Sequence, residues 1–143
     1  MANGRVDPYP AFAFKVELDG IFVAAFTDVG GMDTTVEVTE FAEGGDRTAK
    51  KLPGKVKYSN ITLKYGLTDD RSLYDWLLAA AKGDVQRKSG SIVILDLQGN
   101  EKVRWNFRDA WPTSWKGAAL AAKGNEYAIE EMDLAHEGIE RVS

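Results

Sequence analysis

The sequence AFAFKVELDGIFVAAF, residues 11–26, decides the fold class. Apolar side chains at positions 12, 14, 16 and 18 alternate with Lys15, Glu17 and Asp19, a period of two that is typical of a half-buried β-strand. Asp19-Gly20 is a hairpin turn signal, so residues 21–26 are predicted to return as a second strand. The chain is therefore expected to consist mainly of antiparallel strands.

Further segments repeat this period of two or are rich in β-branched residues. They are residues 34–41, 56–65, 91–97, 103–110 and 126–135. Within the fourth segment Val103, Trp105 and Phe107 share the apolar face, and Trp111-Pro112 is expected to end the strand. Arg104 and Arg108 then face outward, where they are free to meet acidic groups of a partner subunit.

One segment has a helical period instead. Apolar residues recur at 73, 76, 77 and 80, which predicts one substantial helix over Asp70–Lys82, with Asp70 at its start and Gly83 just after its end. Short strands and one helix in 143 residues predict a mainly β fold. We expect an antiparallel β-sandwich or partly closed barrel with one α-helix, in a single domain over residues 1–143.

Composition excludes several function classes. Hydrophobic residues make up 44% of the chain, which indicates a folded core, and cysteine is absent, which removes disulfides and thiolate metal sites. The net charge of -4 disfavours stable nucleic-acid binding. The longest apolar run, Trp76–Ala81, is too short to cross a membrane, so insertion of the subunit alone is not expected.

Charge is divided between two stretches of opposite sign. From residue 47 to 64 the chain is basic without an acid, at Arg47, Lys50, Lys51, Lys55, Lys57 and Lys64. From residue 126 to 140 it is acidic without Lys or Arg, at Glu126, Glu130, Glu131, Asp133, Glu137 and Glu140. Two solvated faces would explain this pattern, and so would a basic surface that meets the acidic surface of an identical neighbour.

Two segments are interpreted as extensions. Residues 1–10 are polar and contain Pro8 and Pro10, which indicates an N-terminal arm. Ala42–Gly54, bounded by glycine turns, is predicted to be an extended assembly loop because structureless loops of about 12 residues or more are often functional. In the acidic stretch, at least one of Glu126, Glu130 and Glu131 is expected to be buried against Arg104, Arg108 or the cluster at 50–57, either within a subunit or across an interface.

Catalytic and metal-binding patterns are weak. The sole histidine, His136, has no companion His or Cys ligands, so we interpret it as a structural side chain. The stretch GDVQRKS at 83–89 lacks the second glycine of a phosphate loop, because Arg87 takes its place. No enzymatic activity, cofactor or metal is therefore predicted.

Several segments together resemble the tail tube family of contractile phages and phage-tail-like injection systems. They are DPY at 7–9, VELDGI at 16–21, EGGD at 43–46, KLPG at 51–54, YSNITLKYGLT at 58–68, VQRKSGSI at 85–92, RWNF at 104–107, AWP at 110–112 and LAHEG at 134–138. No single motif is specific, but the resemblance covers nearly the whole chain in order.

This resemblance implies hexameric rings that stack into a hollow tube inside a contractile sheath, with a fold similar to the haemolysin-coregulated protein of type VI secretion. The expected partners are further copies of the chain, a sheath protein, baseplate and spike proteins, and protein or DNA cargo in the lumen. Assembly in the bacterial cytoplasm and incorporation into a tail or tail-like particle are expected. The candidate assembly residues are Arg47, Lys50, Lys51, Lys55, Lys57, Arg104, Arg108, Glu126, Glu130 and Glu131.

Other functions stay open from the sequence. A secreted hexameric ring of the type VI kind or a specialised ring near the baseplate would share the fold. A small-molecule-binding barrel would require an apolar cavity with a few convergent polar groups. The sequence does not distinguish a phage tail from a bacteriocin or an injection system.

Overall fold

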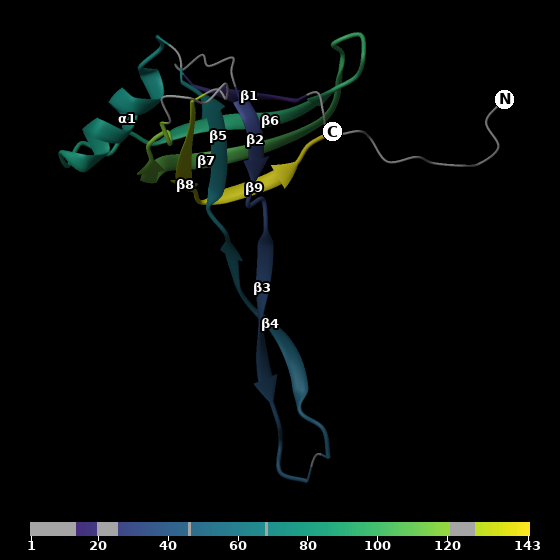
Figure 1. The fold of residues 1–143 in the computed structure, drawn as a ribbon. Helices are drawn as coiled ribbons and strands as arrows, with labels where there is room; N and C mark the ends of the chain where they lie inside the picture. The colour runs from purple at the N-terminus through teal and green to yellow at the C-terminus, as the bar shows by residue number, and fades with distance from the viewer. Residues whose placement is uncertain (1–13, 20–25, 46, 68, 121–127) are drawn as a thin grey trace, which may run out of the picture.

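The computed structural model describes residues 14–19, 26–45, 47–67, 69–120 and 128–143. These residues form nine strands and one helix, and antiparallel pairing joins seven strands of the body in one sheet while two form a separate hairpin (Figure 1). The elements are β1 Phe14–Leu18, β2 Phe26–Gly30, β3 Thr34–Phe41, β4 Lys50–Tyr58, β5 Ile61–Gly66, α1 Ser72–Ala81, β6 Lys88–Leu95, β7 Glu101–Lys116, β8 Ile129–Ala135 and β9 Gly138–Arg141.

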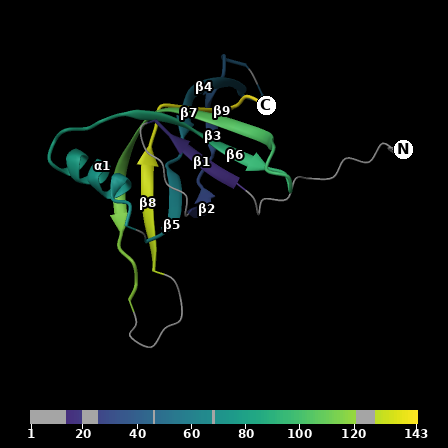
Figure 2. The same ribbon diagram turned by 90° about the horizontal axis from the view of Figure 1, so that it is seen from above.

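The seven-stranded sheet follows the order β1-β6-β7-β8-β5-β2, and β9 pairs with β7 beside this path. Viewed from above, β1 and β6 cross over the layer that contains β8, β5 and β2 (Figure 2). Among the described residues β1 and β2 do not pair with each other, so the sheet curls without closing. The mainly β, antiparallel and partly closed architecture predicted from the sequence is confirmed.

Strand β7 links the two layers. Its first half pairs with β6 and β9, and its second half pairs with β8. Asp109, at φ 52°, lies where the register with β6 shifts, and aspartate is one of the few side chains that tolerate this left-handed backbone. The expectation that Pro112 ends the strand is wrong, because Pro112 pairs with Leu134 beside a bulge, where a missing N–H is tolerated.

The core lies between the two layers. Strands β5 and β8 direct alternate side chains into it, and Leu63 lies directly opposite Met132 in their register. Val16 of β1 and Phe107 of β7 close the core from the other layer, and Phe107 is buried as its apolar face predicts. The fully buried side chains are Ile61, Leu63, Met132, Leu134 and Val93.

Helix α1 packs at one end of the layers (Figure 1). Leu73 and Trp76 are buried in the core, and the Trp76 indole donates to the backbone oxygen of Gln86 at 2.6 Å. The helix is shorter than predicted, but Asp70 still serves its first turn by accepting a hydrogen bond from the Ser72 backbone N–H at 2.9 Å.

Two strand predictions need correction. The opening strand, β1, pairs with β6, and the described end of the expected return strand, Phe26, begins β2, which pairs with β5; residues 1–13 and 20–25 lie outside the described residues. The predicted strand 126–135 begins at Ile129, with Glu126 outside the described residues, and a further strand, β9, follows it.

Candidate assembly surface

Strands β3 and β4 form a two-stranded arm that projects far from the body (Figure 1). Every residue of the two strands is exposed except Glu37 and Tyr58, which are partly buried. Apolar side chains on the arm remain about half in water, or more, at Val36, Val38, Phe41, Leu52 and Val56. A hairpin of two strands is marginally stable alone, and exposed apolar clusters mark interaction sites, so the arm is the first candidate for contact with a partner.

The loop predicted at 42–54 is shorter in the structure. Residues 50–54 belong to β4 and pair with β3, so the connection between the strands is only the segment 42–49. Pro53 and Gly54, which indicate a turn in the sequence, lie at a bulge where Val36 pairs with Val56 but Val38 pairs with Pro53. A Cβ on Gly54 would lie 3.2 Å from the backbone oxygen of Glu37, so the bulge leaves little room for a side chain there.

The root of the arm is held by hydrogen bonds. The Ser59 N–H donates to the backbone oxygen of Asp33 at 3.1 Å, and the Asp33 N–H donates to the Ser59 hydroxyl at 3.2 Å. Gly31 has φ 78° and a Cβ there would lie 2.1 Å from the Asn60 oxygen, so this turn requires glycine. The position and direction of the arm relative to the body are thereby fixed.

His136 lies at the same root. Its Nε2 is 2.9 Å from the backbone oxygen of Ser59, and its ring lies 5.5 Å from the ring of Tyr58. No group of three potential metal-ligating side chains occurs among the described residues. His136 therefore links the end of β8 to the root of the arm, and its structural role stays a prediction.

The arm carries most of the basic cluster. Lys57 forms an ion pair with Glu37 on the paired strand. The other arm cations make no ion pair with any residue that the structure describes; they are Arg47, Lys50, Lys51 and Lys55, here called the arm cluster. These four charges stand on a projection, at a distance from the acids of β8.

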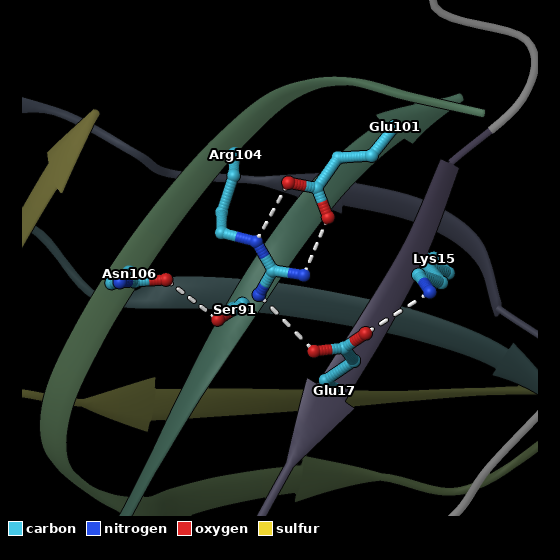
Figure 3. A network of polar contacts seen from close by, with 6 residues as sticks. All are labelled: Lys15, Glu17, Ser91, Glu101, Arg104 and Asn106. Carbon is cyan, nitrogen blue, oxygen red and sulfur yellow. Dashed lines mark hydrogen bonds and ion pairs between the residues drawn. The ribbon is translucent and has the colours of Figure 1, made fainter. Parts of the chain in front are cut away.

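The prediction that Arg104 is free for a partner is wrong. Its side chain does face away from the core, but it donates to Glu101 at 3.0 Å and to Glu17 of β1 at 3.1 Å, and Lys15 lies 3.0 Å from Glu17 (Figure 3). Hydrogen bonds from Lys15 and Arg104 lower the pKa of Glu17, and those from Arg104 lower the pKa of Glu101. This network stabilises the sheet within one chain.

Arg108 also faces outward and is exposed. Its guanidinium donates to the backbone oxygen of Glu137 at 3.0 Å, and it forms no ion pair with the described residues. Arg108 thus holds the turn between β8 and β9 and retains an unneutralised charge.

The acidic strand follows the prediction in part. Glu130 shares the inward face of β8 with Met132 and Leu134 and is only 9% exposed. Within its own chain its hydrogen-bond donor is the Trp115 indole at 3.2 Å, and not Arg104, Arg108 or the cluster at 50–57. A basic partner across an interface stays a prediction. Glu131, on the opposite face, pairs with Lys116 at 3.7 Å. The indole donates a hydrogen bond to Glu130 but carries no charge that would neutralise it.

A hollow of about 390 Å³ lies beside Glu130. Tyr65 and Trp115 line it together with the first turn of α1. The Tyr65 hydroxyl is buried close to the Glu130 carboxylate, and burial together with the charge and hydrogen bonding of Glu130 raises the pKa of Tyr65. The sequence pattern places Tyr65 and Glu130 on inward faces, but only the pairing of β5 with β8 brings them together.

A family model for the T4-like virus tail tube protein gp19 matches residues 10–140. The chain belongs to this family. It is a structural subunit of a tail tube, as the resemblance in the sequence implies. No curated protein matches the sequence significantly. Among the described residues no helix has the length and apolar character needed to cross a membrane.

Solved structures of injection systems are similar to this tail tube protein. A chain in the cryo-EM structure of the anti-feeding prophage cap, a tube terminating cap, is 27% identical with a TM-score of 0.89, over 100% of this chain and 96% of that one. A chain in the extended sheath-tube complex of PVC, an extracellular contractile injection system, is 26% identical with a TM-score of 0.86, over 95% and 92%. Hcp1 from Flavobacterium johnsoniae, at 14% identity and a TM-score of 0.56 over 91% and 94%, shares the fold.

Proposed function

We propose that this tail tube protein forms hexameric rings that stack into the hollow inner tube of a contractile tail or injection machine. The observation that carries the proposal is the β3–β4 arm, which exposes apolar side chains on a projection that its own body does not cover. Surfaces of this kind are buried in an assembly. The arm and the body differ in shape, so their contact is heterologous and generates rings or stacks.

Open strand edges support the same proposal. The ends of the sheet path, β1 and β2, have one described neighbour each, and both strands of the arm have an unpaired edge. Unpaired edges are templates for pairing with another chain. Neighbouring copies would therefore extend the sheet around a lumen, with residues 1–143 acting as a single tube domain.

The proposed partners follow from this role. Sheath protein would surround the tube, baseplate and spike proteins would meet its end, and protein or DNA cargo would pass through it without stable binding. The net charge of -4 favours such non-adhesive passage of nucleic acid. We place assembly in the bacterial cytoplasm, followed by incorporation into a tail-like particle, and we assign the protein a structural and not an enzymatic role.

A second candidate is a specialised ring at one end of the tube. It is favoured by the likeness to chains in the anti-feeding prophage cap and in the PVC sheath/tube terminator, the latter 26% identical with a TM-score of 0.87. A terminal ring assembles once per tube, whereas the main subunit polymerises. A secreted ring of the type VI kind would instead occur as free hexamers outside the cell.

Sedimentation and negative-stain imaging of the purified protein test these proposals. Tubes of variable length indicate the main subunit, and single rings that do not stack indicate a terminal or secreted ring. Monomer alone across a wide range of protein and salt concentration would contradict self-assembly.

A further inference from the structure

Glu130 is a buried carboxylate without a cation. It is 9% exposed, the neutral Trp115 indole donates a hydrogen bond to it, and no Lys or Arg among the described residues forms an ion pair with it. A buried charge that lacks an opposite charge is expensive, so such a site is usually completed by a partner. The adjacent hollow of about 390 Å³ gives a partner access.

The nearest cation of the same chain is engaged elsewhere. Arg71 lines the hollow, but its guanidinium lies 3.5 Å from Asp75 and 5.8 Å from the centre of the Tyr74 ring. Tyr74 in turn meets Trp115 edge to face at 5.6 Å between ring centres. The hollow therefore has aromatic walls, which attract cations, and a carboxylate at one side.

The arm cluster offers cations that have no ion-pair partner among the described residues of their own chain. Arg47, Lys50, Lys51 and Lys55 form no ion pair with described residues of their own chain. They stand on a projection directed away from the body (Figure 1). These charges are thus available to another copy.

We propose that the hollow lined by Tyr65, Trp115 and Glu130 receives a lysine or arginine side chain from the arm cluster of a second copy. The inference rests on the proposed self-assembly and identifies one of its contacts. A lysine ammonium or arginine guanidinium group donates N–H bonds that suit the free lone pairs of the Glu130 carboxylate. Insertion neutralises the buried charge.

The substitution Glu130→Gln separates this role from a purely structural one. Glutamine keeps the size and the oxygen that accepts from Trp115 but removes the charge. We expect the isolated subunit to unfold at the same or a higher urea concentration, while the critical concentration for assembly rises at least about tenfold. Glu131→Gln, which removes a carboxylate already paired with Lys116, is the matched control and should leave assembly within about twofold.

A double-mutant comparison identifies the donor. Glutamine at all four positions of the arm cluster should raise the critical concentration for assembly in the wild-type background. In the Glu130→Gln background the same substitutions should raise it by less than a further factor of about three, because the effects of residues in contact are not additive. Lys57→Gln, whose cation is paired within the arm, is the control. The proposal would be overturned if the fold-changes caused by Glu130→Gln and by the arm-cluster substitutions multiplied in the combined variant. Normal assembly by Glu130→Gln would overturn it too.

Cross-linking tests the contact of Glu130 in the wild-type protein, even if Glu130→Gln does not fold. Tubes assembled from mixed unlabelled and ¹⁵N-labelled subunits are treated with a carbodiimide, which joins a carboxylate to a lysine in contact. Arg47→Lys, which makes every cation of the arm cluster reactive, is treated in parallel. A mixed-isotope cross-link between the peptides of Glu130 and an arm lysine is expected in at least one of the two proteins, and cross-links of Glu130 that are confined to its own chain, or absent, in both proteins would overturn the proposal. If wild-type protein forms neither rings nor tubes, the proposed function itself fails; tubes with an uncoupled Glu130 contradict this inference alone.

Discussion

Removal of the β3–β4 arm should abolish assembly while leaving the body folded. The change replaces residues 35–57 with Asn-Gly, a two-residue hairpin turn. Thr34 and Tyr58 are the last paired residues at the root of the arm, and the Asp33–Ser59 backbone hydrogen bond of 3.1 Å holds the chain ends together, so a short turn can connect them.

The expected change in the free energy of unfolding is small because the arm packs little against the body. Its apolar side chains remain about half exposed or more, and an isolated two-stranded hairpin contributes little stability. Loop-closure entropy scales with the logarithm of loop length, so the shorter connection stabilises the body by at most about 2 kcal/mol. We therefore expect the free energy of unfolding to stay constant or to rise by up to about 2 kcal/mol.

Urea unfolding of the dilute protein measures the stability of the body, and sedimentation with negative-stain imaging measures assembly. The deletion variant should unfold cooperatively at or above the wild-type midpoint and remain monomeric where the wild type forms rings or tubes. An unfolded body would show that the arm is part of the core, and normal tubes would show that it is not an assembly element. Either result would refute the reasoning.

Further predictions concern single side chains. Charge reversal at Lys50 and Lys51 should impair stacking while urea unfolding stays within about 0.5 kcal/mol, because both are exposed; tubes of normal length and yield would contradict this. His136→Gln should leave assembly largely intact and cost about 1 kcal/mol for its bond to the backbone; zinc retained through dialysis and lost in the variant would show a metal site instead. Arg104→Gln should destabilise the subunit by about 1 kcal/mol at pH 7. Lys15 and Arg104 lower the pKa of Glu17 from 4.5, so the ionised carboxylate stabilises the fold above that pH, and this stabilisation is lost as the pH falls through the lowered pKa. The difference between wild type and variant should therefore decrease below pH 4.5, and a difference that stays constant on further acidification would exclude this cause.

The alternating pattern revealed those strands that have one buried face. Residues 14–18 and 103–107 show it clearly, and both form strands whose apolar side chains face the core, as predicted. The helix is likewise found where the period changes. Alternation is strongest where one face of an element is buried against a core.

Half of the arm was found in this way, since the predicted strand at 34–41 has the bounds of β3, but most of β4 was not. Neither face of β4 is buried, so Lys50–Gly54 has no alternation to detect, and Pro53-Gly54 indicates a turn although it forms a bulge. The sequence indicated this segment as a candidate assembly element, which stays a prediction, but it did not reveal the strand structure of residues 50–54. Exposure in the subunit, combined with β-structure, is itself what suggests a partner.

Contacts of the charged site residues could be predicted only in part, because strands far apart in the sequence supply their partners. Alternation correctly turns Arg104 outward and one acidic residue of β8 inward, yet it cannot show that β1 brings Glu17 to Arg104 or that the end of β7 brings Trp115 to Glu130. These neighbours are set by strand order. A sequence pattern gives the direction of a side chain, whereas the sheet topology decides what it meets.

The central claim is tested most directly by cryo-EM reconstruction of particles assembled from the purified wild-type protein. The account predicts stacked sixfold rings around an open lumen, in which the β3–β4 arm of each subunit is buried against another copy. Monomers under all conditions, or tubes in which the arm projects into solvent, would contradict it.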